Sequence, residues 1–239
     1  SVLYTVTLTV DGDETAAPAT LSSSLEPGLT VTDDGVTATV AGDHTVTANV
    51  VWEGTELSAT ASLSVSAADA AEVDLALDTL VTTANEPVGW TTSAVDPYGN
   101  EVGTADVVVS SSAAVVVDGT GAGTVVASAV GTYVVTASLD GASDGEELVV
   151  TAGAAASIAL SLSDETPVLW QTVTASVDVA DAFGNDPSAP YSLWVDGTGT
   201  AMVMGNAITF QSDGEFTVWA ELDGTSIRDS VGPMVVDSI

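Results

Sequence analysis

The chain has 239 residues and a formal net charge of −33, because 34 acidic residues are set against one Arg and no Lys. Nucleic acids and anionic membranes are bound through Lys and Arg, so this composition excludes both as partners. The absence of Cys rules out disulfides and thiolate metal sites, and a single His leaves most nucleophile and base pairs without residues to form them. We therefore predict that the chain is not an enzyme.

Apolar residues, mainly Val, alternate with Thr, Ser and other small or polar residues along most of the chain, which is the period of a half-buried strand. β-branched residues also favour strands. The first such segment, residues 2–10, is followed by the acidic turn Asp11-Gly12-Asp13-Glu14. Further strands are expected at residues 19–21, 29–32, 36–40, from 42 to a hairpin at 52–55, and at 57–65. The pattern predicts an all-β protein.

Two motifs recur along the chain. The first is Asp96-Pro97-Tyr98-Gly99-Asn100, which returns 85 residues later as Asp181-Ala182-Phe183-Gly184-Asn185. The second is a glycine with an aromatic residue two places on, at Gly131 and Tyr133, at Gly214 and Phe216, and more loosely at Gly42 and His44. Fixed spacing of this kind indicates tandem modules. We predict three modules, at residues 1–68, 69–153 and 154–239.

Modules two and three each open with a strand, at residues 73–77 and 158–162. The 85-residue period places the equivalent strand of module one before Ser1. We therefore expect module one to lack its first strand, and the segment to belong to a longer array that completes the open sheet edge.

About seven short strands in 85 residues, with frequent turn signals, are typical of an immunoglobulin-like sandwich. Together with the Asp-x-aromatic-Gly-Asn and Gly-x-aromatic-x-Val motifs, this resembles the bacterial and archaeal immunoglobulin-like repeat domains of the invasin and intimin type. The resemblance implies three tandem β-sandwiches arranged as a rod. It also implies an extracellular, cell-surface location and a structural role in a stalk, S-layer or filament. Its partners would be neighbouring immunoglobulin-like domains of the same or adjacent chains, with self-assembly.

Calcium is the ligand that the acidic turns suggest, although no motif requires a cofactor. Hard cations take carboxylate and carbonyl oxygens. The candidate metal ligands are Asp11, Asp13, Asp96, Asn100, Asp181 and Asn185. None of the turns matches an EF-hand loop, and Asp and Gly-Asn also have a purely conformational use in turns. Both interpretations stay open.

Trp219 follows Val218 on the repeated strand and should point away from the core if Phe216 and Val218 point into it. An outward Trp suggests a lateral contact or a stacking surface. His44 occupies the slot of Tyr133 and Phe216, so we expect it to be structural. The alternative function is therefore an adhesin or lectin-like module that binds a glycan or protein, and a third is an accessory segment of a secreted enzyme.

Overall fold

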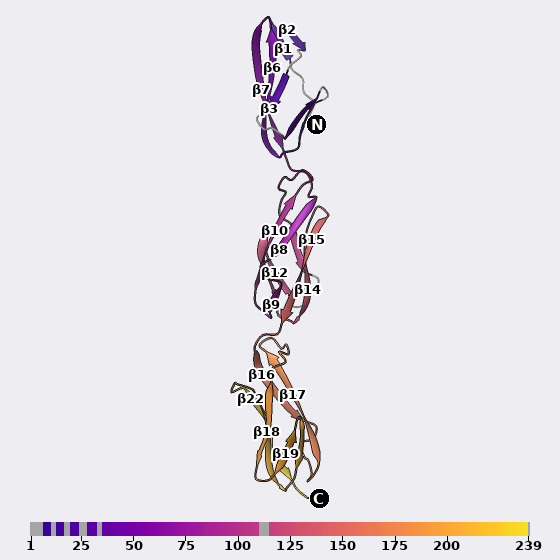
Figure 1. Cartoon of the computed structure of the whole chain (residues 1–239), viewed down its shortest axis with the longest axis vertical. Coiled ribbons are helices and arrows are strands. Elements are labelled where there is room, and N and C mark those ends of the chain that lie inside the picture. The colour runs from indigo at the N-terminus through magenta and orange to yellow at the C-terminus, as the bar shows by residue number, and fades with distance from the viewer. Residues whose placement is uncertain are drawn as a thin grey trace.

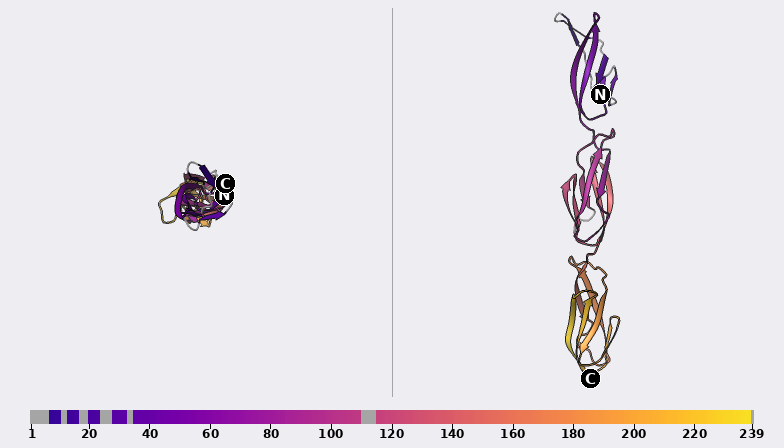
Figure 2. Two further views of the ribbon diagram at one scale, coloured as in Figure 1. Left: turned by 90° about the horizontal axis from the view of Figure 1, so that it is seen from above. Right: turned by 60° about the vertical axis from the view of Figure 1, so that its left-hand side comes forward.

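The computed structural model describes residues 7–10, 13–16, 20–23, 28–32, 35–109 and 115–238, and every regular element in them is a β-strand. Among these residues there is no helix long and apolar enough to cross a membrane. The strands form three groups that follow one another along the long axis of the molecule (Figure 1). Seen down that axis, the groups overlie one another (Figure 2). We name them the first (residues 7–65), second (72–151) and third (155–236) strand groups.

The second strand group consists of two four-stranded sheets packed face to face. One sheet has the order β12-β13-β10-β8 and the other β11-β14-β15-β9. Their bounds are β8 Glu72–Leu77, β9 Val81–Thr83, β10 Val88–Val95, β11 Asp106–Val109, β12 Val115–Thr120, β13 Ala122–Ala127, β14 Gly131–Leu139 and β15 Ala142–Thr151. Strand β9 pairs in parallel with β15, and all other pairs are antiparallel. This is the order of an immunoglobulin sandwich, in which the first, second, fifth and fourth strands face the third, sixth and seventh.

The third strand group repeats this order with a four-stranded sheet, β16-β17-β20-β19, and a three-stranded one, β18-β21-β22. Its strands are β16 Ala155–Leu162, β17 Thr172–Asp181, β18 Tyr191–Gly197, β19 Ala201–Met204, β20 Ala207–Phe210, β21 Gly214–Leu222 and β22 Arg228–Val236. The sequence correctly predicted the immunoglobulin-like arrangement of both groups. In β21 the predicted alternation is present, because Phe216 and Val218 are both buried and the residue between them is not.

The first strand group forms smaller sheets in its described residues, namely β1-β2, β4-β5 and β3-β6-β7. Its strands are β1 Thr7–Val10, β2 Asp13–Ala16, β3 Thr20–Ser23, β4 Leu29–Thr32, β5 Gly35–Ala38, β6 Gly42–Trp52 and β7 Thr55–Val65. The predicted hairpin between β6 and β7 is present, with positive φ angles at Glu53 and Gly54 that suit a tight two-residue turn. Asp13, which the sequence placed in the acidic turn, pairs with Val10 as the first residue of β2, and Asp11 and Gly12 lie outside the described residues.

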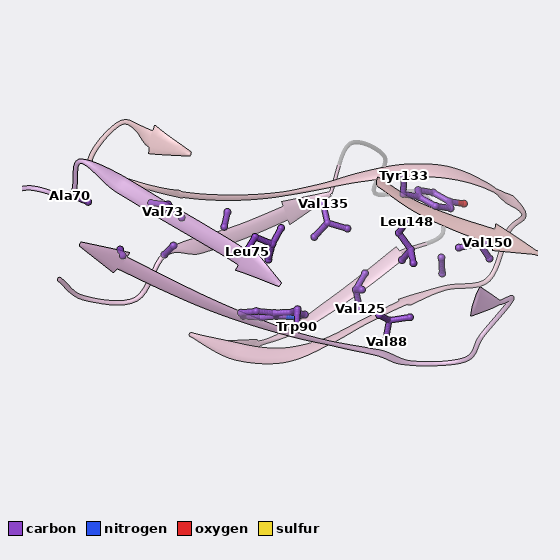
Figure 3. Packing of buried hydrophobic residues seen from close by; sticks show 14 of the residues in the cluster. Ala70, Val73, Leu75, Val88, Trp90, Val125, Tyr133, Val135, Leu148 and Val150 are labelled. Carbon is purple, nitrogen blue, oxygen red and sulfur yellow. The ribbon is translucent and has the colours of Figure 1, made fainter. Parts of the chain in front are cut away.

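The two sandwich cores place their large side chain on opposite strands. In the second group, Trp90 of β10 is 2% exposed and Ala127 of β13 is also buried, and Figure 3 shows Trp90 and Val88 facing the side chains of β14 and β15. In the third group the small residue, Ala175, is on β17 and the large one, Phe210, is on β20. Phe210 packs against Phe216 with ring centroids 4.9 Å apart. Trp90 pairs with Gly123, and Ala127 is four residues further along β13, so the positions that differ between the two groups lie in different layers of the core.

The burial of Trp90 predicts a large loss of stability when its ring is removed. Trp90→Ala should destabilise the second group by about 3–5 kcal/mol, because it leaves a cavity in the core. Adding Ala127→Phe should not recover that loss, because Ala127 lies four residues along β13 from Gly123, the partner of Trp90. Chemical unfolding followed by far-ultraviolet circular dichroism measures the stability of both variants. A loss below about 1 kcal/mol for Trp90→Ala would contradict its place in the core.

Candidate functional site

The first Asp-x-aromatic-Gly-Asn turn is closed by its own aspartate. The Asp96 side chain is 3% exposed and directly follows β10. Its Oδ1 accepts hydrogen bonds of 2.9 Å from the backbone N–H groups of Tyr98 and Asn100. Gly99 has a φ of +83°, which a glycine adopts without steric cost. The predicted conformational use of Asp and Gly is therefore confirmed, whereas Asn100 does not adopt a positive φ.

The other oxygen of Asp96 fixes the segment that enters the second strand group. Oδ2 accepts a 3.0 Å hydrogen bond from the backbone N–H of Ala68, between β7 and β8, and a 2.8 Å bond from Nδ2 of Asn100. One buried carboxylate thus receives four N–H donors. Because carboxylates are acceptors only, this arrangement saturates both oxygens and leaves the amide of Asn100 held in one orientation.

The side chain of Asn100 connects this turn to the first strand group by two hydrogen bonds. Its Nδ2 donates to the backbone oxygen of Thr39 at 2.9 Å, and its Oδ1 accepts from the backbone N–H of Ala41 at 2.8 Å. The side-chain amide therefore bonds a loop of the first group as a neighbouring strand would, through one donor and one acceptor. We call this loop, residues 39–41, the first acceptor loop.

The contact region between two successive strand groups is called a junction below. The second Asp-x-aromatic-Gly-Asn turn makes the same contacts at the junction of the second and third strand groups. Oδ1 of Asp181 accepts from the N–H groups of Phe183 and Asn185 at 2.8 and 2.9 Å. Its Oδ2 accepts from Gly153 at 2.9 Å and from Nδ2 of Asn185 at 3.0 Å. Across the junction, Asn185 donates to the oxygen of Ser128 at 2.9 Å and accepts from the N–H of Val130 at 3.1 Å. Residues 128–130 form the second acceptor loop.

Each acceptor loop is in turn held by the aromatic residue of the second motif. The Tyr133 hydroxyl donates to the oxygen of Ala129 at 2.8 Å. Nε2 of His44 lies 2.8 Å from the oxygen of Val40, four residues earlier in the chain as in the tyrosine case. This is the tyrosine corner of immunoglobulin-like folds, with histidine in place of tyrosine in the first group. The structural interpretation of His44, which is 1% exposed, fits this contact.

The hydrogen bonds decide the charge state of the two aspartates. Burial by itself raises the pKa of the Asp96 carboxyl, but the bonds from the Asn100 side chain and from three backbone N–H groups outweigh it and lower the pKa to about 2. The same balance lowers the pKa of Asp181. Both carboxylates are thus ionised at neutral pH without a cationic partner.

Four of the six predicted metal ligands lie at the junctions, namely Asp96, Asn100, Asp181 and Asn185, and Asp13 is exposed on β2. Asp11 lies outside the described residues. Among the described residues, no group of three or more His, Cys, Asp or Glu side chains is placed to hold a metal ion. The carboxylate oxygens at the junctions face N–H donors, and the positive ends of those dipoles do not suit a cation. Calcium binding stays a prediction.

Trp219 lies on β21 between the buried residues Val218 and Ala220, so its side chain is on the outer face of the sheet. It stacks on Trp194 of β18, with ring centroids 6.1 Å apart and planes 10° from parallel. The guanidinium of Arg228 lies 4.8 Å from the Trp219 ring centroid. The only cation other than histidine in the sequence therefore rests on this aromatic pair.

The lowered pKa values predict an acid-sensitive contribution to stability. The pKa of Asp96 in the folded protein is about 2, below the ordinary 3.8, so its stabilising effect is present above pH 3.8 and is lost as pH falls through about 2. The difference in melting temperature between the unmodified protein and Asp96→Asn should therefore be largest above pH 3.8 and shrink toward pH 2. Glu147→Gln, at an exposed position of β15, is the matched control. A difference for Asp96→Asn that stays constant with pH would contradict the assignment.

No protein-family model matches the chain, and no curated protein matches it. Solved structures do. The extracellular cadherin domains 1–5 of protocadherin gamma B2 match with a TM-score of 0.54 and 9% identity, over 100% of this chain and 57% of that one. Cadherin domains share the two-sheet sandwich architecture of immunoglobulin-like folds. At this level of identity the similarity concerns the fold alone.

Two bacterial surface proteins are similar at lower TM-scores. The Escherichia coli adhesin FdeC matches at 0.43 with 18% identity, over 98% of this chain and 87% of that one. Invasin, a bacterial integrin-binding protein, matches at 0.48 with 19% identity, over 95% of this chain and 55% of that one. The chain thus spans little more than half of the invasin and protocadherin structures. None of the three is described as an enzyme, and the invasin-type repeats that the sequence resembles are among the known structures similar to this chain.

Proposed function

We propose that this chain is a structural segment of an extracellular surface protein, in which three immunoglobulin-like domains follow one another as a rod. The domains are residues 1–68, 69–153 and 154–239. The observation that carries the proposal is the repeated junction contact, in which Asn100 and Asn185 bond the acceptor loop of the preceding strand group. The succession of the three groups in Figure 1 supports it as well.

The junction contacts favour a stiff spacer over beads on a flexible string. At each junction the linker is bonded through the N–H of Ala68 or Gly153 to the aspartate of the turn. The asparagine of the same turn bonds the preceding group. Because aspartate and asparagine are themselves bonded to each other, the linker and the acceptor loop are fixed relative to one turn. A change of angle between groups would have to break bonds at partly buried positions.

The charge of the chain fits a surface location. Its self-repulsion opposes lateral clumping and is screened in salty media. The junctions themselves use backbone groups, amides and two aspartates whose charge is already satisfied by N–H donors, so assembly along the rod does not bring unpaired charges together. The partners we propose are other immunoglobulin-like domains of the same or adjacent chains.

Calcium binding would add to this framework. It would be demonstrated by a higher melting temperature in millimolar Ca²⁺ than in NaCl of equal ionic strength, reversed by a chelator.

Removing both asparagine side chains should make the rod flexible. Asn100→Ala with Asn185→Ala deletes the four bonds to the acceptor loops and should cost about 1–3 kcal/mol at each junction. Small-angle X-ray scattering should then show a shorter average maximum dimension, while circular dichroism of the strands stays unchanged. Tyr98→Ala with Phe183→Ala is the matched control, because these rings are 64% and 47% exposed and the turns use only their N–H groups. Equal scattering from all three proteins would contradict the proposed role of the junctions.

A recognition function is the second candidate, and the Trp194, Trp219 and Arg228 cluster is the observation that favours it. Sugar rings and peptide side chains stack on such surfaces. Glycan-array binding that is lost in Trp219→Ala would support this function, and no binding to glycans or surface proteins would leave the structural role alone.

A further inference from the structure

A third loop of the acceptor type lies at the end of the third strand group. Residues 211–213 connect β20 to β21, as residues 128–130 connect β13 to β14, and they too precede a Gly-x-aromatic strand. Gly214 has a φ of +157°, close to the +159° of Gly131 and the +133° of Gly42. Because Gly214 pairs with Val236, the last residue of β22, this loop is at the C-terminal end of the group.

The backbone of this third loop is held as in the first. The N–H of Gln211 donates to the oxygen of Thr200 at 2.8 Å. In the first acceptor loop, the N–H of Thr39 donates at 2.9 Å to the oxygen of Gly28, which is also eleven residues earlier. By this alignment, Gln211 corresponds to Thr39 and Ser128, and Asp213 corresponds to Ala41 and Val130.

The third loop lacks the side-chain hydrogen bond that Tyr133 and His44 make to the other two loops. Phe216 has no hydroxyl to bond the loop as Tyr133 does. Instead, Oγ of Ser212 accepts a 2.8 Å hydrogen bond from the N–H of Thr200. The loop is therefore fixed from the neighbouring strand connection, and it keeps a defined position without the tyrosine corner.

At the other two junctions, one backbone oxygen and one backbone N–H of the acceptor loop bond the asparagine side chain. In the third loop the corresponding two groups are bonded to none of the described residues. Within the described part of the chain, the oxygen of Gln211 and the N–H of Asp213 have no hydrogen-bond partner. An exposed aromatic residue adjoins them: Trp170, 63% exposed, donates its N–H to the oxygen of Phe210 at 2.9 Å. Asn85 makes the equivalent bond, to Ala127, at the junction of the second and third groups.

We propose that the loop of residues 211–213 is a docking site for the Asp-x-aromatic-Gly-Asn turn of a further immunoglobulin-like domain. The asparagine of that turn would accept from the N–H of Asp213 and donate to the oxygen of Gln211, and Trp170 would supply apolar contact area. The occupant is identified by the two junctions already present, where the same backbone pair binds the same turn. This proposal rests on the proposed function, because it names the partner surface of the array.

Asp213 distinguishes this site from the other two loops, which have Ala41 and Val130 at the same position. The bonds use its backbone N–H, which every residue but proline supplies. Its carboxylate adds a negative charge next to an acidic partner, so docking here should tighten as ionic strength rises and screens that repulsion. The first two junctions have no such charge in the loop and should respond less.

The test extends the whole chain by a second copy of residues 69–153 placed directly after Ile239. In this alignment Ile239 takes the position of Ala68, and the peptide around Asp213 stays unique in the sequence. Amide hydrogen exchange, measured at high ionic strength, should slow at Asp213 by about tenfold or more relative to the unextended chain. Asn100→Ala in the appended copy alone should abolish that protection, and Glu101→Gln in the same copy, an exposed change beside the turn, should not.

Two internal controls accompany this measurement. Protection of the core strand peptides in the appended copy, compared between Asn100→Ala and Glu101→Gln, shows that the copy is folded in both. The N–H groups of Ala41 and Val130 report the existing junctions in every sample. Unprotected Asp213 with protected Ala41 and Val130 would overturn the docking site alone, whereas exposure of all three would overturn the proposed junctions as well.

Discussion

The structure depends on two buried aspartates that have no cationic partner. A carboxylate taken out of water is expensive unless hydrogen bonds replace its hydration, and a chain without Lys has almost no cations with which to pair it. Asp96 and Asp181 meet this requirement with N–H groups from their own turn, from the linker and from one asparagine side chain. Satisfying the charge therefore also fixes the linker and aims the asparagine at the preceding strand group.

The same requirement explains why the two junctions are alike although the cores are not. The cores carry their large residue on different strands, with Trp90 on β10 and Ala127 on β13 in one group and Ala175 on β17 and Phe210 on β20 in the other. Packing tolerates different apolar residues as long as the core stays filled. A junction that depends on directed hydrogen bonds tolerates far fewer substitutions, because each donor must lie within a few tenths of an ångström of the right distance from its acceptor. Glutamine or aspartate in place of Asn100 would change either the reach or the donor.

Charge and assembly are separated in this molecule. Among the described residues, the acidic side chains other than Asp96 and Asp181 are not buried, and their charges repel other molecules. The contacts between strand groups use neutral backbone and amide groups, and the two buried aspartates bond only N–H donors. Arg228 is placed on Trp219 rather than at a junction. The proposed rod could therefore be strongly acidic and still keep neighbouring domains in contact, because the repulsion would act mainly between separate rods.

The sequence by itself determined the strands, the turns and the repeat, since each of these is encoded over a few residues. The alternation in residues 214–222 placed Phe216 and Val218 inside and Trp219 outside, and glycine at positions 99 and 184 predicted turns that need a positive φ. It also placed His44 in an aromatic slot.

Only the tertiary structure decided what Asn100 and Asn185 do. Their partners in the acceptor loops are 59 and 55 residues away in the chain, so no local pattern records the contact, and an asparagine after glycine reads as an ordinary turn residue. The pairing of Trp194 with Trp219 is likewise a product of strand pairing, which brings together side chains whose sequence spacing carries no signal.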